Sequence, residues 1–422
     1  MKLNPPMIVE YAINKLNNNG FEAYLVGGSV RDAIMGYNIS DYDITTNASL
    51  DEIKLVFSFD KVKEYSNNKT LCIIKNHEYV EITPFKGTTI EEDLSNRDFT
   101  INAIAYDLKE IIDPFKGRLD LFNKIIRCPI DSNITIANDP LRMLRAIRFS
   151  GKYNFQIDDE LKDTMKANSD LFLTMKKDRM KIELDKILLL DNPSIYIKEY
   201  KEIFFNIFPG LRLCDGFDQQ TKYHNLDVLS HILKVVDNVD CNLVSRLSAL
   251  LHDIKKPECF TKDEKGGHFY GHWSKSRDYA NKILKDFNYS NDIIKRVCKL
   301  IEYHDYKIEN NKKAILSFIY IFKTEDIDLL FDLKKADIIA QHPNYRYQIE
   351  ELINLYVAVR KIIDNKEYIN IDTLAITNTE LIDIGIIPTN IKDIVDKICL
   401  AIIDNKIKNS KTEIIEYIKN IN

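Results

Sequence analysis

The chain has 422 residues, of which 45% are hydrophobic and 29% are charged, and its formal net charge is −5. A chain of this length exceeds one ordinary hydrophobic core, so we expect two to four domains. The hydrophobic content excludes a largely disordered chain. The acidic balance excludes a uniformly basic nucleic-acid binder, so a polyanionic partner must be bound by local basic patches.

We expect a cytoplasmic protein that does not enter a membrane. The longest apolar run, residues 314–322, is too short to span a bilayer, and the first six residues lack the apolar core of a secretory signal. The seven cysteines are scattered, odd in number and include no Cys-x-x-Cys pair. This pattern indicates reduced thiols and argues against a disulfide framework or a zinc ribbon.

The predicted elements begin with a small region in which helices and strands alternate, and from about residue 126 onward the pattern is almost wholly helical. The fold class is therefore α+β, with a small mixed α/β head followed by an all-helical body. Helices are predicted in the head over 7–18 and 30–35, and strands over 23–26, 39–45, 70–75 and 79–85, the last two joined by a turn at 76–78.

Two aspartates, Asp41 and Asp43, follow a glycine pair that ends an apolar strand. In the segment 39–45 polar and apolar residues alternate, which predicts a half-buried strand with both carboxylates on one face. Two hard oxygen ligands there can share Mg²⁺ ions that also bind phosphate oxygens. Gly28 and the glycine before it let backbone N–H groups approach a triphosphate, and Arg31 adds positive charge. Taken alone, the glycine pair is explained by an ordinary turn and the two aspartates by a solvated acidic strand. Because the two features are adjacent, they predict a nucleoside-triphosphate site for metal-assisted transfer.

A second cluster lies in the segment 138–149, which begins like a helix, with Asp139 at the N-cap and Pro140 at the first helical position. Arginines recur every third residue from Arg142 to Arg148, an arrangement that by itself is a solvated or salt-bridged face slightly more often than a ligand site. A carboxylate accepts from the exocyclic amino group of cytosine or adenine, and a guanidinium donates to the ring nitrogen beside it. Asp139 with Arg142 could therefore admit CTP and ATP and exclude UTP and GTP, with a discrimination of about 1–3 kcal/mol.

A third cluster, of imidazoles and carboxylates, lies in the helical body. Residues 246–253 form an apolar helix that ends in two potential ligands. Imidazole together with carboxylate suits borderline transition metals and Mg²⁺ or Mn²⁺, and the helical patterns permit a site between the helices of a bundle. A single histidine is more often a structural residue, and His224 and His268 have no better assignment than that. The candidate ligands are His231, His252, Asp253, His272, His304 and Asp337.

Together these segments resemble the bacterial tRNA nucleotidyltransferases of the polymerase-β-like superfamily, in particular the CCA-adding type with an appended HD domain. The resemblance covers about residues 20–345 and is specific because its motifs occur in combination. It implies a nucleotidyltransferase head at 1–125, a base-reading and RNA-binding helical neck at 126–215, an HD domain at 216–345 and a helical tail at 346–422. The motifs are the segments 27–32 (Gly-Gly-Ser-Val-Arg-Asp), 41–43 (Asp-Tyr-Asp), 97–103 (Arg-Asp-Phe-Thr-Ile-Asn-Ala), 113–115 (Asp-Pro-Phe) and 139–149 (Asp-Pro-Leu-Arg-Met-Leu-Arg-Ala-Ile-Arg-Phe).

The resemblance also implies roles for individual residues. Asp41 and Asp43 would hold Mg²⁺ at the head, with Glu81 on a neighbouring strand as a third catalytic carboxylate. Asp139 and Arg142 would read the base. The third cluster resembles the HD phosphohydrolase signature, which implies a divalent transition metal there. The other implied nucleotide ligands are Gly28, Arg31, Arg97, Asp98, Asn102, Arg145 and Arg148.

Three positions and one segment depart from the family pattern. Asn96, Lys116 and Asn138 stand where the family commonly has arginine, glycine and an acidic residue. The segment 82–96 is much shorter than in typical CCA-adding relatives. In the family this loop is flexible and is linked to the switch from CTP to ATP, and relatives that add only the two cytidines lack it. The short segment leaves open whether the terminal adenosine is added.

The predicted reaction is the template-independent addition of CMP and AMP to the 3′ end of tRNA, which builds or repairs CCA and releases pyrophosphate. The 3′-hydroxyl of the acceptor arm would attack the α-phosphate of CTP or ATP, assisted by ions that Asp41 and Asp43 hold. The alternatives are a CC-adding enzyme, a poly(A) polymerase, and a protein that is chiefly a metal-dependent HD phosphohydrolase. A non-catalytic RNA-binding module fits the full set of carboxylates and arginines least well.

Overall fold

The computed structural model describes residues 3–39, 41–65, 70–75, 77–264 and 266–421. The contacts within the chain divide it into two compact units. The first unit comprises Met1–Leu190 and Glu199–Ile207, and the second comprises Asp191–Lys198 and Phe208–Asn422. The division into four domains, with boundaries near residues 125, 215 and 345, is finer than these units and stays a prediction.

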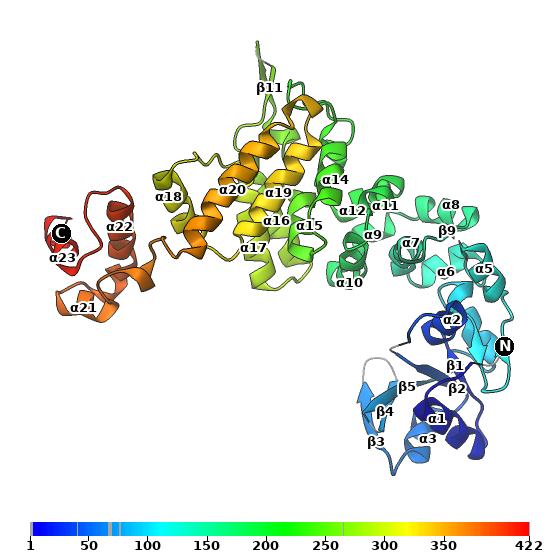
Figure 1. Cartoon of the computed structure of the whole chain (residues 1–422). Coiled ribbons are helices and arrows are strands. Elements are labelled where there is room, and N and C mark those ends of the chain that lie inside the picture. Colours follow the sequence, from blue (N-terminus) through cyan, green and yellow to red (C-terminus); the bar gives the residue numbers. More distant parts are fainter. Residues whose placement is uncertain (1–2, 40, 66–69, 76, 265, 422) are drawn as a thin grey trace. The chain divides into compact units, whose positions relative to one another are not determined.

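The head of the first unit is built on a mixed sheet, in which the described residues form seven strands in the order β3-β4-β5-β2-β1-β6-β7 (Figure 1). Strand β2 pairs antiparallel with β1 and parallel with β5. The register places Val26 of β1 and Glu81 of β5 on either side of Asp43 in β2. The strands are β1 (Ala23–Val26), β2 (Asp43–Thr46), β3 (Lys61–Tyr65), β4 (Thr70–Lys75), β5 (Glu78–Pro84), β6 (Ala105–Tyr106) and β7 (Ile111–Ile112).

Helices α1 and α3 pack against the strands of this sheet, because each presents an apolar face to it. In α1 the residues Val9, Ile13 and Leu16 are fully buried, and the helix contacts β1 and β5. Helix α3 begins with a capping box between Ser49 and Glu52. The head helices are α1 (Met7–Asn18), α2 (Gly28–Met35), α3 (Leu50–Val56), α4 (Ile90–Ser95), the 3₁₀ turn η1 (Thr100–Asn102) and α5 (Gly117–Asn123).

The remainder of the first unit is helical and is organised around α7. Met143, Leu144 and Ile147 of this helix are fully buried, and α7 packs against α10. This packing fixes the arginine-bearing face of α7 toward the head. The elements are β8 (Ile125–Ile126), α6 (Ser132–Asn138), α7 (Leu141–Tyr153), β9 (Gln156–Ile157), α8 (Asp159–Ala167), α9 (Leu171–Thr174), α10 (Lys177–Leu188) and α12 (Lys201–Ile207).

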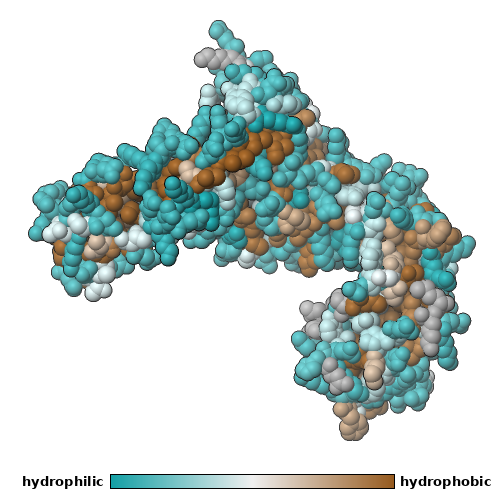
Figure 2. All heavy atoms as spheres, in the orientation of Figure 1, coloured by the Kyte–Doolittle hydropathy of each residue, from teal (hydrophilic) through white to brown (hydrophobic). Residues whose placement is uncertain are grey.

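The second unit contains a helical bundle in which α14 packs against both α15 and α19, and α17 packs against α15 and α16. Its C-terminal helices form a separate apolar cluster that includes Ile398 and Ile414. Apolar side chains also gather on the exposed face of α20 in Figure 2, where Ile353 and Val357 are 49% and 59% exposed. The main elements are α14 (Val228–Asn238), α15 (Leu243–Leu251), β10 (Thr261–Asp263), β11 (Gly266–His268), α16 (His272–Asp286), α17 (Asn291–Tyr303), α18 (Lys312–Phe322), α19 (Ile327–Ala340), α20 (Gln348–Asp364), α21 (Asn378–Asp383), α22 (Ile391–Ile403) and α23 (Lys411–Ile421).

The predicted α+β architecture agrees with the structure, but the head also contains strands β3, β6 and β7 and helices α3, α4 and α5, which were not predicted. The helix over 7–18 and the strands over 23–26 and 70–75 have the predicted bounds, and the strand predicted over 79–85 is shifted by one residue. Within the described ranges, we find no helix whose length and apolarity would let it cross a bilayer.

Two element boundaries differ from prediction near the candidate site. The strand predicted over 39–45 begins only at Asp43, so the first aspartate precedes the strand. Asp139 is not the N-cap of α7, because it ends α6 with an extended backbone (φ −154°, ψ 99°) and Pro140 takes the cap position. Its side chain still accepts a hydrogen bond from the backbone N–H of Leu141 at 3.2 Å. Two residues of predicted elements, Ser40 and Asn76, lie outside the described residues.

Candidate active site and metal centre

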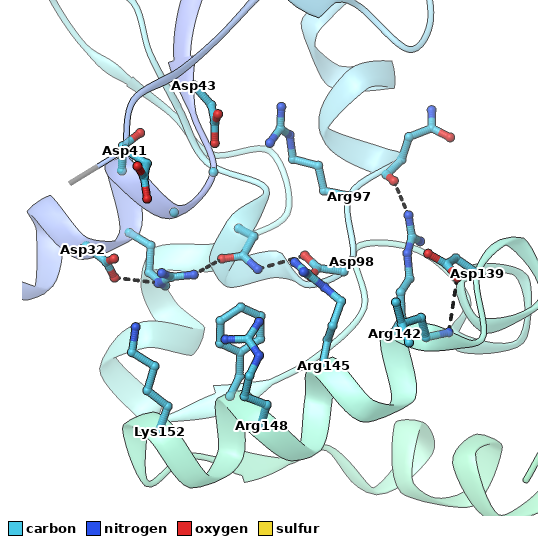
Figure 3. Close-up of a pocket in the computed structure, with 18 of the residues that line it drawn as sticks. Asp32, Asp41, Asp43, Arg97, Asp98, Asp139, Arg142, Arg145, Arg148 and Lys152 are labelled. Carbon is cyan, nitrogen blue, oxygen red and sulfur yellow. Dashed lines mark hydrogen bonds and ion pairs between the residues drawn. The ribbon is translucent and has the colours of Figure 1, made fainter. Parts of the chain in front are cut away.

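A cavity of about 590 Å³ opens in the first unit where α2, β2 and α7 meet (Figure 3). A volume in this range is typical of small-molecule sites. Seven cationic side chains and five carboxylates line it, which suits a polyanion accompanied by cations. The residues predicted to form the nucleotide site that line this cavity are Gly28, Arg31, Asp41, Asp43, Arg97, Asp98, Asn102, Asp139, Arg142, Arg145 and Arg148.

The glycine pair has the conformation that a phosphate-binding turn requires. Gly27 has a φ of +72°, a left-handed conformation that a side chain would strain. A Cβ atom at this position would also lie 3.0 Å from Nη1 of Arg97. Helix α2 begins at the next residue, Gly28, which lines the cavity. The unpaired N–H groups of the first helical turn are therefore available to an anion.

The two aspartates line the same cavity, close to the glycine turn (Figure 3). Burial raises the pKa of Asp43, and the carboxylate of Asp41 raises it further, while Arg97 opposes the shift. Asp41 also accepts a hydrogen bond from the hydroxyl of Tyr79. Crowded carboxylates of this kind favour a bound cation, which removes their mutual repulsion.

Glu81, the third predicted carboxylate, lies beside Asp43 in the register of β2 and β5 but does not belong to the cavity lining. Burial raises the pKa of Glu81, and the carboxylates of Asp43 and Asp41 add to the shift. In the part of the chain that the structure describes, these three carboxylates do not form a compact three-ligand group. The structure thus places Glu81 near the aspartates, and its role as a ligand stays a prediction.

Arg31 is held rigidly at one wall of the cavity. Its side chain is buried, its Nε lies 2.8 Å from Oδ1 of Asp32, and it donates a hydrogen bond to Oδ1 of Asn102. Its guanidinium carbon lies 5.1 Å and 4.9 Å from the ring centroids of Phe149 and Tyr153. Contacts with aromatic faces and a carboxylate fix the plane of the guanidinium while leaving its charge available.

A continuous chain of polar contacts extends from Asn102 to the arginines of α7 (Figure 3). Asn102 donates to Oδ1 of Asp98 at 2.8 Å, and Arg145 donates to Oδ2 of Asp98 through Nε at 2.8 Å and Nη2 at 2.6 Å. Burial alone would raise the pKa of Asp98, but Arg145 outweighs it and holds the pKa below its usual range. Glu183 of α10 accepts from Arg148 and lies 3.7 Å from Arg145. This network preorganises the cavity wall before a ligand binds.

The two predicted base-reading residues both line the cavity, and each is positioned by other residues. Oδ1 of Asp139 lies 3.2 Å from Nη2 of Arg179, which projects from α10. Arg142 donates to the backbone carbonyl oxygens of Asn96 at 2.6 Å and Thr135 at 3.3 Å. Two of the five N–H groups of Arg142 are thus used for positioning, and the others can serve a base.

Several residues that shape the cavity were missed by the sequence reasoning. Arg179 and Glu183 are four residues apart, so they lie on the same face of α10, and that spacing of charges is a signal that could have pointed to them. Lys86 and Lys152 also line the cavity, but no sequence motif marks them. Their placement depends on how the head and α7 pack.

The candidate metal ligands of the second unit converge at the ends and inner faces of bundle helices. Their ligand atoms form two overlapping groups that share Asp253, and within each group all atoms lie within 4.8 Å of one another. The first group is His231, His252, Asp253 and Asp337, and the second is Asp253, His272 and His304. The two spare histidines lie outside both groups. His224 packs edge-on against His231 with its ring centroid 4.9 Å away, and His268 pairs with Asp263 at 2.9 Å.

The buried atoms at the centre of this cluster fit a cation. Asp253 and His252 are both 0% exposed, and neither the carboxylate oxygens of Asp253 nor Nε2 of His252 has a hydrogen-bond partner in the described ranges. Oδ2 of Asp253 is partly neutralised by Nζ of Lys256 at 2.6 Å. Leaving a buried polar atom without a hydrogen bond destabilises the folded protein by about 1–3 kcal/mol. A divalent cation bound to these atoms would remove that destabilisation.

Family profiles match three segments of the chain. The Poly A polymerase head domain family matches residues 23–89 and 85–127. The family described as the probable RNA and SrmB-binding site of polymerase A matches residues 154–213, and the HD domain family matches residues 221–365. The protein is therefore a nucleotidyltransferase whose head is followed by an HD domain.

Curated relatives define the family more closely. The CC-adding tRNA nucleotidyltransferase of Shouchella clausii is 40% identical over 207 residues, which are 49% of this chain and 54% of that protein, so the match spans about half the length of each. The CCA-adding enzyme of Staphylococcus aureus strain Mu3 is 27% identical over 97% of this chain and 96% of that protein. The chain belongs to the tRNA nucleotidyltransferases that carry an HD domain.

Solved structures share the fold. The CCA-adding enzyme of Bacillus stearothermophilus in complex with CTP superposes with a TM-score of 0.71 at 20% identity, over 99% of this chain and 98% of that chain. The Thermotoga maritima CCA-adding enzyme complexed with tRNA superposes with a TM-score of 0.60 at 20% identity, over 99% and 97%. The predicted fold class and the predicted class of enzyme are both confirmed.

Proposed function

We propose that this nucleotidyltransferase adds CMP and AMP to the 3′ end of tRNA, which builds or repairs the CCA end with release of pyrophosphate. The names of the curated relatives support this activity, and so do the solved structures of related enzymes with CTP and with tRNA. The observation that carries the proposal is one cavity that joins Asp41 and Asp43 to a row of fixed arginines and to Asp139. We place the activity in the cytoplasm, as the cysteine pattern predicts.

Different residues of the cavity have different roles in phosphate transfer. Mg²⁺ held by Asp41 and Asp43 would neutralise phosphate charge and assist deprotonation of the attacking hydroxyl. The N-terminal N–H groups of α2 and the guanidinium of Arg31 bind the triphosphate. The network from Asn102 to Arg145 holds the remaining donors in place. Because the protein forms no covalent bond in this reaction, positioning and charge stabilisation supply most of the acceleration.

Base selection follows from the free atoms of Asp139 and Arg142. Among the described residues, the hydrogen bonds and ion pair of the Asp139 side chain all fall on Oδ1, which leaves Oδ2 to accept from an exocyclic amino group. Arg142 keeps N–H groups that can donate to the adjacent ring nitrogen. Cytosine and adenine present both partners side by side, whereas uracil and guanine present a carbonyl oxygen and a ring N–H at the corresponding positions. The protein therefore selects CTP and ATP without a nucleic-acid template.

A CC-adding enzyme is the second candidate, favoured by the compact segment between β5 and Arg97. The amide of Asn96 donates to the carbonyl oxygens of Lys86 at 2.9 Å and Glu92 at 2.8 Å. The carboxylate of Glu92 accepts from the hydroxyl of Thr88 at 2.8 Å. These internal hydrogen bonds hold the segment in a compact conformation.

One assay separates these candidates. A tRNA that lacks its CCA end is incubated with CTP alone, with ATP alone and with both, and the 3′ ends are sequenced. Ends in CCA with both nucleotides support the proposal, and ends that stop at CC support the second candidate. A run of adenosines with ATP alone would indicate a poly(A) polymerase. No extension in any mixture would contradict all three.

We also propose that the histidine and aspartate cluster of the second unit binds a divalent transition metal. The mixed imidazole and carboxylate donors suit Mn²⁺, Co²⁺ or Ni²⁺ better than Mg²⁺. The buried atoms without hydrogen bonds around Asp253 support this assignment. A bound metal of this kind supplies Lewis-acid polarisation of a phosphate ester. Calorimetric titration of the full chain with Co²⁺ tests it, and the absence of binding that depends on Asp253 would contradict it.

A further inference from the structure

The seven cationic side chains of the head cavity differ in whether other protein groups bind them. Five are arginines, and an oxygen atom of the protein accepts from each. These partners are Asp32 for Arg31, Asp93 for Arg97, the carbonyl oxygen of Asn96 for Arg142, Asp98 for Arg145 and Glu183 for Arg148. The other two are Lys86 and Lys152, whose ammonium groups form no hydrogen bond or ion pair with another residue that the structure describes. Their charges are therefore the ones that the protein leaves for a ligand.

Lys86 belongs to the end of the cavity where the base is read. Its carbonyl oxygen accepts from the side-chain amide of Asn96 at 2.9 Å. The carbonyl oxygen of Asn96 in turn accepts from Arg142 at 2.6 Å. These contacts connect Lys86 to a residue that we assign to the base.

Lys152 belongs to the other end, where the triphosphate is expected. Its Nζ atom lies 4.9 Å from the ring centroid of Tyr153, and the guanidinium carbon of Arg31 lies 4.9 Å from the same centroid. The hydroxyl of Tyr153 lies 3.2 Å from Oδ1 of Asp32, which also binds Arg31. The side chain of Lys152 is exposed, and in Figure 3 it points from α7 into the cavity on the side of Asp32.

Helix α7 places Lys152 in line with its arginines. Arg145, Arg148 and Lys152 are separated by three and four residues, so they share one face of the helix. Because a helix rises 1.5 Å per residue, Arg142 and Lys152 are separated by about 15 Å along its axis. This span is comparable with the length of an extended nucleoside triphosphate. With the base at Arg142, the last phosphates reach Lys152.

We propose that Lys152 binds the terminal phosphates of the incoming nucleotide and stabilises pyrophosphate as it leaves. This inference rests on the proposed nucleotide addition and deepens it, since it names a residue for the leaving group. In the transfer, the 3′-oxygen of the tRNA bonds to the α-phosphorus, and its proton passes to solvent. The bond from the α-phosphorus to the bridging oxygen breaks, and its electron pair stays on the pyrophosphate. An ammonium that no protein anion neutralises stabilises this growing charge, and its flexible stem can follow the departing group.

Ligands that differ only in their phosphates test the assignment in the full chain. Lys152→Met keeps the length of the side chain and removes its charge. Calorimetric titration of this variant should show CTP bound about tenfold more weakly, because a charge-assisted hydrogen bond is lost, whereas CMP should bind as before. The inhibition constant of inorganic pyrophosphate, measured against CMP incorporation into a truncated tRNA, should also rise about tenfold. Lys152→Arg keeps the charge and should restore most of both losses.

The matched control is Lys166→Met, which removes an exposed lysine of α8 that does not line the cavity and should change neither constant. Circular dichroism establishes that each variant is folded. A lysine in the last turn of a helix also stabilises the helix dipole. A lower melting temperature of Lys152→Met with unchanged affinities for CTP and pyrophosphate would show that role alone and overturn the inference.

Two further outcomes separate this inference from the proposed function. An equal loss of affinity for CMP and CTP would place Lys152 at the base or sugar and overturn the inference, while tRNA extension by the parent protein would leave the proposed function intact. If the parent extends no tRNA but binds CTP through Lys152, the proposed addition fails and the phosphate contact is supported. A parent that does not bind CTP would contradict both.

Discussion

The cavity of the head and the histidine and aspartate cluster of the HD domain satisfy their charged groups in opposite ways. In the head, Asp98 is buried but is paired with Arg145 at 2.6 Å, and Arg31 is paired with Asp32 at 2.8 Å. In the HD cluster, Oδ1 of Asp253 faces only imidazole nitrogens and makes no hydrogen bond in the described ranges. The charged groups of the head cavity are thus held by other protein groups, whereas buried atoms of the HD cluster would be satisfied by the metal that we propose it binds.

The largest expected effect comes from the head aspartates. Asp43→Asn keeps the shape of the side chain but removes a charge that holds the cation, so CMP incorporation into a truncated tRNA should fall by about a thousandfold. Co²⁺ binding by the second unit should not change, since that site is independent. Asp51→Asn is the matched control, because the Asp51 side chain is 97% exposed in the same domain. Near-normal incorporation by Asp43→Asn would contradict the assigned site.

A bound transition metal should raise the unfolding free energy of the unit that contains the HD domain, and it should not raise that of the head. At a free Co²⁺ concentration of 100 times the dissociation constant, the unfolding free energy of the metal-binding unit should rise by about 2.7 kcal/mol for each ion bound. Differential scanning calorimetry with and without a chelator measures this shift. The Asp253→Asn variant should show no such gain. An equal gain in that variant would show that the stabilisation does not come from the cluster.

A smaller effect is expected for Arg142, which we propose selects the base in the head cavity. Arg142→Ala removes the donor to the ring nitrogen, so the ratio of kcat/KM for CTP over UTP should fall by about 5–150-fold, which corresponds to about 1–3 kcal/mol. Extension assays with each nucleotide measure the ratio. Arg118→Ala, an exposed arginine of the head outside the cavity, should leave the ratio unchanged. A uniform loss for all nucleotides would indicate that Arg142 binds phosphate instead of base.

The smallest effect is expected for Arg179→Ala. Its pair with Asp139 is partly exposed, with side chains 55% and 35% accessible, and pairs of this kind contribute about 0.2–1 kcal/mol. The preference for CTP over UTP should therefore fall by about fivefold at most. Lys181→Ala on the same helix, which pairs with Asp185 at 3.0 Å, is the control. A loss as large as that of Arg142→Ala would mean that Arg179 contacts the base directly.

The sequence by itself determined the local features of this protein. Helix and strand periods, the glycine turn before α2 and the spacing of charged residues depend on neighbours along the chain, so they predicted the mixed head, the helical body and several of the residues that line the cavity, among them Asp41, Asp43 and Arg142. The boundary of α7 was wrong by one residue because Asp139 still belongs to the end of α6.

Only the tertiary structure decided which charged groups meet. Arg179 and Glu183 contact the cavity residues Asp139 and Arg148 because α10 packs against α7. Arg142 contacts the carbonyl oxygen of Asn96, 46 residues away in the chain. The two-sided environment of Asp253 arises from helices that are separated by long segments of sequence. Such pairs depend on how packed elements are placed in space, and no periodicity or motif within one segment carries that information.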